Sequence, residues 1–320
     1  MELRFDRLIT LYLASPYLQL VRGRKRSIPI LMYHSITDQD DSKLHPYYRT
    51  TTTPAMFAAQ LQLLQDAGYT TCTLATAVNS LQFETSTSAK PVVITFDDGY
   101  ADFQRYAFPL LQQHGFSATV FLPTAYIGDG PLHFKGKDCL TWAQVCELQR
   151  HGISFGSHTV THPWLLELSV REIRDEVVNS KLTIEEKLGC AVDSFAYPYA
   201  FPQTDTAFKK TLHSLLQEAG YQNGVCTTVG RASRGSEPLF LERLPVNSCD
   251  DKALFEAKLA GGYDWIAQTQ QVSKMVKARL RGLLGRSKPR VSNEFPGVRA
   301  HSQESGHAPP GPVRSESQSL

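Results

Sequence analysis

Three absences in this chain of 320 residues each exclude a class of protein. Its six cysteines form no CxxC pair, which argues against a zinc ribbon, a thioredoxin-type site or a dense disulfide framework. No apolar run reaches the ~20 residues that a membrane-spanning helix needs. Lys and Arg (33) nearly balance Asp and Glu (31), so the net charge of +2 creates no field directed at nucleic acid. With 42% hydrophobic residues, the composition is that of an ordinary globular protein.

The first 27 residues have two readings. Leu8 to Val21 are mostly apolar, and a basic stretch, Arg22 to Arg26, follows at once. A signal peptide begins with a positively charged region, which Glu2 and Asp6 interrupt here, and no clear cleavage site follows. A surface helix or disordered leader is therefore as well supported as an anchor that lies in a membrane interface.

The last 58 residues, 263–320, divide into two parts by composition. Within 263–285, apolar residues recur at helical spacing between basic ones, which predicts a basic amphipathic helix suited to a membrane surface. Such stripes more often pack on their own domain. Residues 286–320 are rich in Gly, Pro and Ser, so we expect a disordered tail. The folded body is then 28–262.

A repeated unit of helix, glycine and strand fills this body. Glycines 68, 115, 152, 189 and 220 each follow a helical pattern and precede an apolar run, as glycines that end helices do. The predicted strands are 28–32, 92–96, 118–122, 153–156, 194–197, 222–226 and 240–244, and the predicted helices between them are 54–67, 106–114, 141–151, 170–188 and 206–219. Strands that alternate with helices indicate a parallel sheet. We expect a single α/β domain, a distorted (β/α) barrel of about seven parallel strands, with an open doubly wound sheet as the alternative.

Polar clusters follow three of the predicted strands, where the chemistry of such folds is found. Asp97 and Asp98 follow one strand, His158 and His162 follow another, and Pro198 and Tyr199 follow a third. Two histidines at i and i+4 can face the same side of a helical turn. Together with one carboxylate they form a three-ligand site with open positions, as in hydrolytic metal centres. Adjacent carboxylates at a strand end point in different directions, so the second stays free as a base.

These motifs resemble those of the polysaccharide deacetylases with a NodB-homology domain, carbohydrate esterase family four. The segments 95–100 (TFDDGY) and 157–163 (SHTVTHP) match the family's first two motifs, and 195–199 (FAYPY) resembles the third in its exopolysaccharide-deacetylase variant. The resemblance covers residues 28–246. It implies that Asp98, His158 and His162 bind a divalent metal, zinc above all, that Asp97 is the general base, and that the backbone N–H of Tyr199 helps to hold the oxyanion.

Two departures from the family pattern leave roles open. The arginine that usually pairs with the base is replaced by Ala196, and Arg243 is the candidate substitute, although an arginine at a strand end is more often part of a structural ion pair. The family's late Leu-x-x-His motif is missing from the body. Its spacing occurs instead at Leu31 to His34. Because the first and last strands of a closed barrel are neighbours, His34 is our candidate general acid; the alternative is that it only ends a strand.

The resemblance implies metal-dependent hydrolysis of N-acetyl groups on a polymer or oligomer that contains N-acetylglucosamine. Two alternatives stay open: a metal-dependent amidohydrolase acting on another C–N substrate, and an inactive carbohydrate-binding relative. Two imidazoles and a carboxylate also suit Fe²⁺, Ni²⁺ or Co²⁺. Trp164 could stack on a sugar ring or simply pack. The lack of a clean signal peptide favours the cytoplasm or the membrane periphery, whereas the usual polymer substrates of the family favour secretion.

Overall fold

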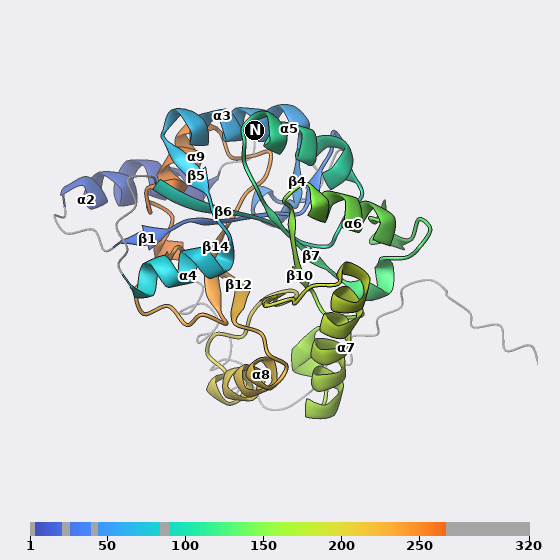
Figure 1. Cartoon of the computed structure of the whole chain (residues 1–320). Coiled ribbons are helices and arrows are strands. Elements are labelled where there is room, and N and C mark those ends of the chain that lie inside the picture. Colours follow the sequence, from blue (N-terminus) through green and yellow to red (C-terminus); the bar gives the residue numbers. More distant parts are fainter. Residues whose placement is uncertain (1–3, 21–25, 40–43, 84–89, 267–320) are drawn as a thin grey trace, which may run out of the picture. The chain divides into compact units, whose positions relative to one another are not determined.

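The computed structural model describes residues 4–20, 26–39, 44–83 and 90–266 (Figure 1). Its centre is a closed barrel of seven parallel strands. In spatial order around the barrel these are β2 (Ile30–Tyr33), β14 (Leu241–Pro245), β12 (Asn223–Val229), β11 (Ser194–Ala196), β10 (Ser154–Ser157), β7 (Thr119–Leu122) and β6 (Lys90–Phe96). The predicted barrel is confirmed, and each of the seven predicted strands contributes to it.

Strand β2 closes the barrel. It pairs with β14 through Leu31 and Leu244, and with β6 through Ile30 and Val93, both in parallel. The first strand is therefore the neighbour of the last, as expected of a closed barrel. An eighth strand, β5 (Tyr69–Thr71), extends the sheet by pairing with the beginning of β6.

Five helices occur where the sequence predicts them. They are α3 (Pro54–Asp66), α5 (Phe108–Gln113), α6 (Trp142–Arg150), α7 (Val170–Leu188) and α8 (Thr206–Glu218), with a π-helical turn, η3 (Phe103–Ala107), before α5. All five predicted glycines, at 68, 115, 152, 189 and 220, have positive φ. This left-handed conformation ends a helix and costs glycine little, since it has no Cβ.

Two further helices, α4 (Leu74–Gln82) and α9 (Lys252–Leu259), were not among the predicted ones. Thr73 caps α4 and Asp251 caps α9, each by accepting a hydrogen bond from a backbone N–H of the first turn. Helix α4 does not end in the glycine pattern that identified the others. Helix α9 does, because Gly261 follows its C-cap residue Ala260 with a φ of 92°. Before β2, residues 5–20 form one helical segment of α1 (Phe5–Ile9), η1 (Thr10–Ala14) and α2 (Ser15–Leu20).

The remaining elements are short. They are the strand pairs β1 (Ser27–Ile28) with β13 (Ala232–Ser233), β3 (Ser35–Ile36) with β4 (Thr51–Thr52), and β8 (His133–Phe134) with β9 (Lys137–Asp138), and the 3₁₀ turns η2 (Pro46–Tyr48), η4 (Thr124–Tyr126) and η5 (Leu165–Glu167). Within the described ranges, no helix combines the length and the apolar character needed to cross a membrane.

Strand alternation produces two apolar cores. One side of the strands contributes Ile30, Val93, Phe121, Val225 and Leu241 to a small interior core, which α4 covers with its own apolar side chains. The opposite side of the strands packs under the surrounding helices in a larger core. Successive side chains of a strand point to opposite faces, so a barrel strand that is covered on both sides is apolar along its whole length.

The larger core continues past the predicted body, because Tyr263 and Ile266 are buried in it. The predicted limits, 1–27, 28–262, 263–285 and 286–320, stay predictions. Residues 267–320, which include the predicted disordered tail and most of the predicted amphipathic helix, lie outside the described residues.

Gly156 in β10 offers a test of interior packing. A Cβ there would lie 2.6 Å from the Phe121 ring and 2.8 Å from the Ser194 carbonyl oxygen. We expect Gly156→Ala to destabilise the protein by about 1–3 kcal/mol, the usual cost of overpacking, measured by urea unfolding. Gly130→Ala is the matched control, since its Cβ would meet nothing within 4 Å. Equal stability of the two variants would contradict the packing argument.

Candidate metal and catalytic site

The carboxyl ends of the parallel strands meet at one rim of the barrel. Asp97 and Asp98 directly follow β6, His34 follows β2, and His158 follows β10. The structure brings all of them together there with His162 and Tyr199. Both aspartates and both of the paired histidines are buried, whereas Tyr199 is about half exposed.

Asp98, His158 and His162 form a group that could hold a metal ion. One ligand atom from each side chain lies within 4.8 Å of the other two. The Nε2 atoms of His162 and His158 lie 3.2 Å and 3.6 Å from Oδ1 of Asp98. This oxygen is buried and receives no hydrogen bond of acceptable geometry. A buried carboxylate oxygen without a donor, faced by two imidazole nitrogens, fits a divalent cation.

Neighbouring groups fix the orientation of these side chains. The Tyr100 hydroxyl donates to Oδ2 of Asp98 at 3.0 Å, which leaves Oδ1 for the histidines. The Nδ1 atom of His158 lies 2.8 Å from the carbonyl oxygen of Ala196. Because a carbonyl only accepts, Nδ1 carries the proton and Nε2 presents its lone pair to the site. Such partners hold metal-binding side chains in place in many metalloproteins.

The ionisation states suit metal binding at neutral pH. Burial lowers the pKa of His158 to about 4, so its imidazole is neutral. Burial alone would raise the pKa of Asp98, but the contact with His162 and nearby positive charge hold that pKa far below the ordinary value. A neutral imidazole and an ionised carboxylate are the forms that bind a metal.

The prediction that His158 and His162 share a helical turn is wrong. The segment between them is an irregular loop in which Thr159 and His162 have left-handed φ values of 68° and 56°. The Thr159 hydroxyl oxygen accepts a hydrogen bond from the backbone N–H of His162 at 3.0 Å. The two imidazoles still converge, but they do so through this turn and not through helical periodicity.

Glu176 of α7 holds this histidine loop, and no motif in the sequence identifies it. Its carboxylate accepts hydrogen bonds from the backbone N–H groups of Val160 and Thr161 at 2.7 Å and 2.9 Å, and from the Thr161 hydroxyl at 2.6 Å. Three donors from two consecutive residues fix the loop firmly. The only signal in the sequence is an acidic residue within the first two turns of the helix that follows the loop.

Asp97 contacts other side chains than Asp98 does, as expected for adjacent carboxylates. Arg243 pairs with it in a bidentate geometry, with both nitrogen–oxygen distances at 2.7 Å. The side chain of Arg243 is fully buried. Burial alone would raise the pKa of Asp97, but Arg243 outweighs this effect and lowers it below the ordinary value. Arg243 therefore makes the contact with Asp97 that the family's usual arginine, replaced here by Ala196, would make.

His34 lies beside this pair, with Nε2 3.9 Å from Oδ2 of Asp97. Its pKa is lowered, because burial outweighs the attraction of Asp97 and Asp98. The side chain keeps 20% of its surface exposed, so the imidazole is accessible from the rim.

Two different parts of the chain line the two sides of the metal group. Tyr199 has a left-handed φ of 56°, and its ring lies 4.5 Å from that of His162. The Thr227 hydroxyl donates to the Tyr199 carbonyl oxygen at 2.7 Å. On the other side, the β8–β9 hairpin places the Phe134 ring 5.1 Å from His162 and Nζ of Lys135 3.6 Å from Asp98. Lys135 was not predicted as a site residue.

Comparisons with known proteins identify the family of this chain. Residues 84–224 match the model of the polysaccharide deacetylase family. The chain is 33% identical over 220 residues to YxkH of Bacillus subtilis, which is named as a polysaccharide deacetylase, and the match covers 69% of this chain and 71% of YxkH.

Solved structures show the same fold. The deacetylase PplD of Streptococcus pyogenes, solved in complex with acetate, matches with a TM-score of 0.64 and 26% identity, over 74% of this chain and 99% of PplD. The polysaccharide deacetylase BA0330 of Bacillus anthracis matches with a TM-score of 0.59 and 25% identity, over 73% of this chain and 69% of BA0330. On its fold and its sequence, the chain belongs to the polysaccharide deacetylase family, hydrolases that act on carbon–nitrogen bonds.

Proposed function

We propose that this protein removes N-acetyl groups from a polysaccharide or oligosaccharide that contains N-acetylglucosamine, as a member of the exopolysaccharide-deacetylase subgroup, and releases acetate. The observation that carries the proposal is that two adjacent aspartates have different neighbours. Asp98 faces two histidines, whereas Asp97 is held by Arg243 beside His34. The acetate in the PplD structure is consistent with an acetate product.

Asp98, His158 and His162 would hold the divalent metal, for which Zn²⁺ is our assignment. The metal would polarise the acetamide carbonyl and make a nearby water more acidic. Asp97 accepts the proton of the attacking water. Its lowered pKa keeps it ionised, and the Arg243 fork fixes the direction of its oxygens. The backbone N–H of Tyr199 donates to the oxyanion, a contact whose loss typically costs about 3–4 kcal/mol.

His34 is the proposed general acid, with Nε2 as the atom that protonates the leaving amine. Because burial lowers its pKa, His34 is neutral near pH 7 and must gain a proton before it can donate one. The neighbouring Asp97 gains a proton during the attack. A carboxyl group with a lowered pKa gives up its proton readily. The proposed route runs from Asp97 to His34, whose Nε2 lies 3.9 Å from Oδ2 of Asp97, and then to the amine. The balanced reaction consumes one water and yields acetate and the free amino sugar.

Trp164 lies next to the histidine loop and exposes 45% of its surface. We propose that it stacks on a sugar ring of the substrate.

Two alternatives to this function remain: an amidohydrolase that acts on another C–N substrate, and an inactive carbohydrate-binding relative. The first assay below separates them. We also propose that the protein acts in the cytoplasm or at the periphery of the membrane.

The first prediction concerns metal and substrate. Protein stripped of metal and reloaded with Zn²⁺ should release acetate from N-acetylglucosamine oligomers, and Asp97→Asn should abolish the release while retaining the metal. Acetate release and bound metal are measured on the same samples. Turnover confined to small amides would favour another amidohydrolase. Binding of oligomers without any turnover, even with metal restored, would favour the inactive relative.

The second prediction concerns Arg243. Arg243→Met leaves the Asp97 carboxylate buried and unpaired, so we expect a loss of about 3–5 kcal/mol in the free energy of unfolding at neutral pH. The double variant Asp97→Asn/Arg243→Met removes the unpaired charge and should regain part of that loss. Urea unfolding of the four proteins of this cycle measures the coupling. An additive cycle would mean that the two side chains do not stabilise one another.

The contribution of the Arg243–Asp97 pair to the free energy of unfolding depends on pH in a definite direction. The folded pKa of Asp97 lies below its ordinary value of 3.8, so the pair stabilises the fold above about pH 4 and loses this contribution as the pH falls. Arg243→Lys keeps the positive charge but cannot donate two parallel hydrogen bonds to the carboxylate, which should raise the pKa of Asp97. The acidic limb of kcat/KM should then move to higher pH than in the wild type.

The third prediction concerns His34. His34→Ala should lower kcat by ~10²–10⁴ and leave bound metal unchanged, because His34 is not among the three metal-binding candidates. His151→Ala, at an exposed position at the end of α6, is the matched control and should retain full activity. Full turnover in His34→Ala would remove the assignment of His34 as general acid.

A further inference from the structure

The N-terminal helical segment, residues 5–20, turns a row of apolar side chains outward, while its charged side chains contact the body of the protein. Among the residues of the segment whose burial the structure describes, the exposed ones are Phe5, Leu8, Tyr12, Leu13, Pro16, Tyr17 and Leu20, and all of these are apolar or aromatic. We call this surface the N-terminal stripe. A surface helix of a soluble protein shows the opposite arrangement.

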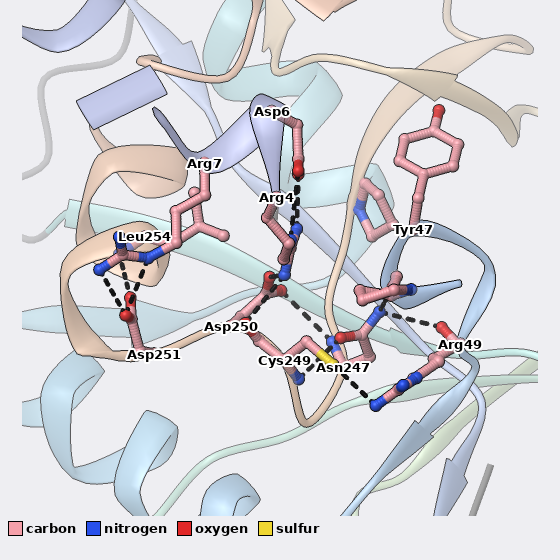
Figure 2. Close-up of polar contacts among 12 residues, drawn as sticks. Arg4, Asp6, Arg7, Tyr47, Arg49, Asn247, Cys249, Asp250, Asp251 and Leu254 are labelled. Atoms are coloured by element: carbon pink, nitrogen blue, oxygen red, sulfur yellow. Dashed lines mark hydrogen bonds and ion pairs between the residues drawn. The ribbon is translucent and has the colours of Figure 1, made fainter. Parts of the chain in front are cut away.

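The polar side chains of the segment bind it to the body. Arg4, directly before the segment, donates to the Cys249 carbonyl oxygen at 2.8 Å and to Asp250 at 3.2 Å, and Arg7 pairs with Asp251 (Figure 2). Asp250 is buried and also receives a hydrogen bond from Lys258 of α9 at 2.6 Å. Breaking a buried ion pair is costly, so these contacts fix which face of the helix is turned outward.

Contacts farther along the segment keep the same orientation. The Tyr263 hydroxyl donates to Asp6 at 2.7 Å, and Nε1 of Trp265 donates to the buried Thr10 hydroxyl at 3.0 Å. Gly262 lies so close to the helix that a Cβ on it would meet the Ser15 hydroxyl oxygen at 2.3 Å. The stripe is therefore exposed because the body holds the opposite face, and not because the helix is loosely attached.

The charge around the N-terminal stripe favours one occupant. In the sequence, the six residues directly after Leu20 include Arg22, Arg24, Lys25 and Arg26, and none of the six is acidic. A self-association through the stripe would bring like charges of two copies together. An anionic lipid surface would attract them, and each basic residue near such a surface contributes about 1 kcal/mol.

We propose that the N-terminal stripe is a docking surface for anionic lipid, in which Phe5, Leu13 and Leu20 enter the interface and the tyrosines lie at the level of the headgroups. Tyrosine is enriched at that depth because its ring is apolar and its hydroxyl is polar. Arg4 joins the segment to the loop that follows β14, at the same end of the barrel as Asp97. Docking through the stripe therefore brings the catalytic rim close to the lipid surface.

The test is flotation of the full chain with vesicles. Wild-type protein should float with phosphatidylcholine vesicles that contain phosphatidylglycerol, more weakly with phosphatidylcholine alone, and less as salt is added. The variant Tyr12→Ser/Leu13→Ser/Tyr17→Ser replaces side chains that are 69%, 66% and 65% exposed, so the fold should be retained. Its partition onto the anionic vesicles should fall by about 100-fold or more.

The matched control is Leu182→Ser in α7, an apolar residue that is 55% exposed and distant in sequence from the stripe. It should bind vesicles as the wild type does. The proposal is overturned if the wild type does not bind anionic vesicles, or if the triple variant binds them equally. It is also overturned if sedimentation shows that the wild type is a dimer which the triple variant turns into a monomer, because the stripe would then contact a second copy. Acetate release from soluble oligomers should be unchanged in the triple variant, so this test is independent of the catalytic proposal.

Discussion

The buried ion pair between Arg243 and Asp97 links the closure of the barrel to the chemistry of its rim. Nε of Arg243 donates to the Cys226 carbonyl oxygen in β12, and Nη1 donates to the Thr95 hydroxyl in β6 as well as to Asp97. The Thr95 hydroxyl in turn donates to the Leu31 carbonyl oxygen in β2. One guanidinium from β14 thus connects four strands across the point where the sheet closes. A charge is tolerated inside the barrel because its donors are used by acceptors that the closed sheet puts in place.

Several residues at the rim around this pair have unfavourable backbone conformations. In the described part of the chain, the non-glycine residues with left-handed φ are Asp98, Lys135, Thr159, His162 and Tyr199. Each such conformation costs roughly 1–3 kcal/mol and persists only when the surroundings determine it. Here those surroundings are identifiable: Tyr100 for Asp98, Glu176 for the histidine loop, and Thr227 for the turn at Tyr199. Strain concentrated at five positions around one group of ligands is what a preorganised site requires.

The difference between what the sequence predicted and what it did not has a physical basis. The seven strands and five helices could be predicted because continuous apolar runs, helical spacing and glycines after helices are local signals. The convergence of Asp98, His158 and His162 followed from their places at strand ends. His34 also reached the rim, because closure makes β2 a neighbour of β14 and β6. The geometry of the histidine loop could not be predicted, since it depends on Glu176, which comes from another element. Lys135 was missed for the same reason, because only the folded β8–β9 hairpin carries it to Asp98.

Strand β14 also connects the catalytic rim to the N-terminal segment. Arg243 within the strand holds Asp97, and the loop after the strand carries Asp250 and Asp251, which bind Arg4 and Arg7. Asn247 in this loop is itself held by the carbonyl oxygens of Pro46 and Arg49, so the loop is a rigid support and not a flexible linker. The orientation of the N-terminal stripe is therefore set by the same element that orients the proposed base. A surface that binds the stripe would hold the whole barrel in one orientation, and the open rim would face a fixed direction relative to that surface.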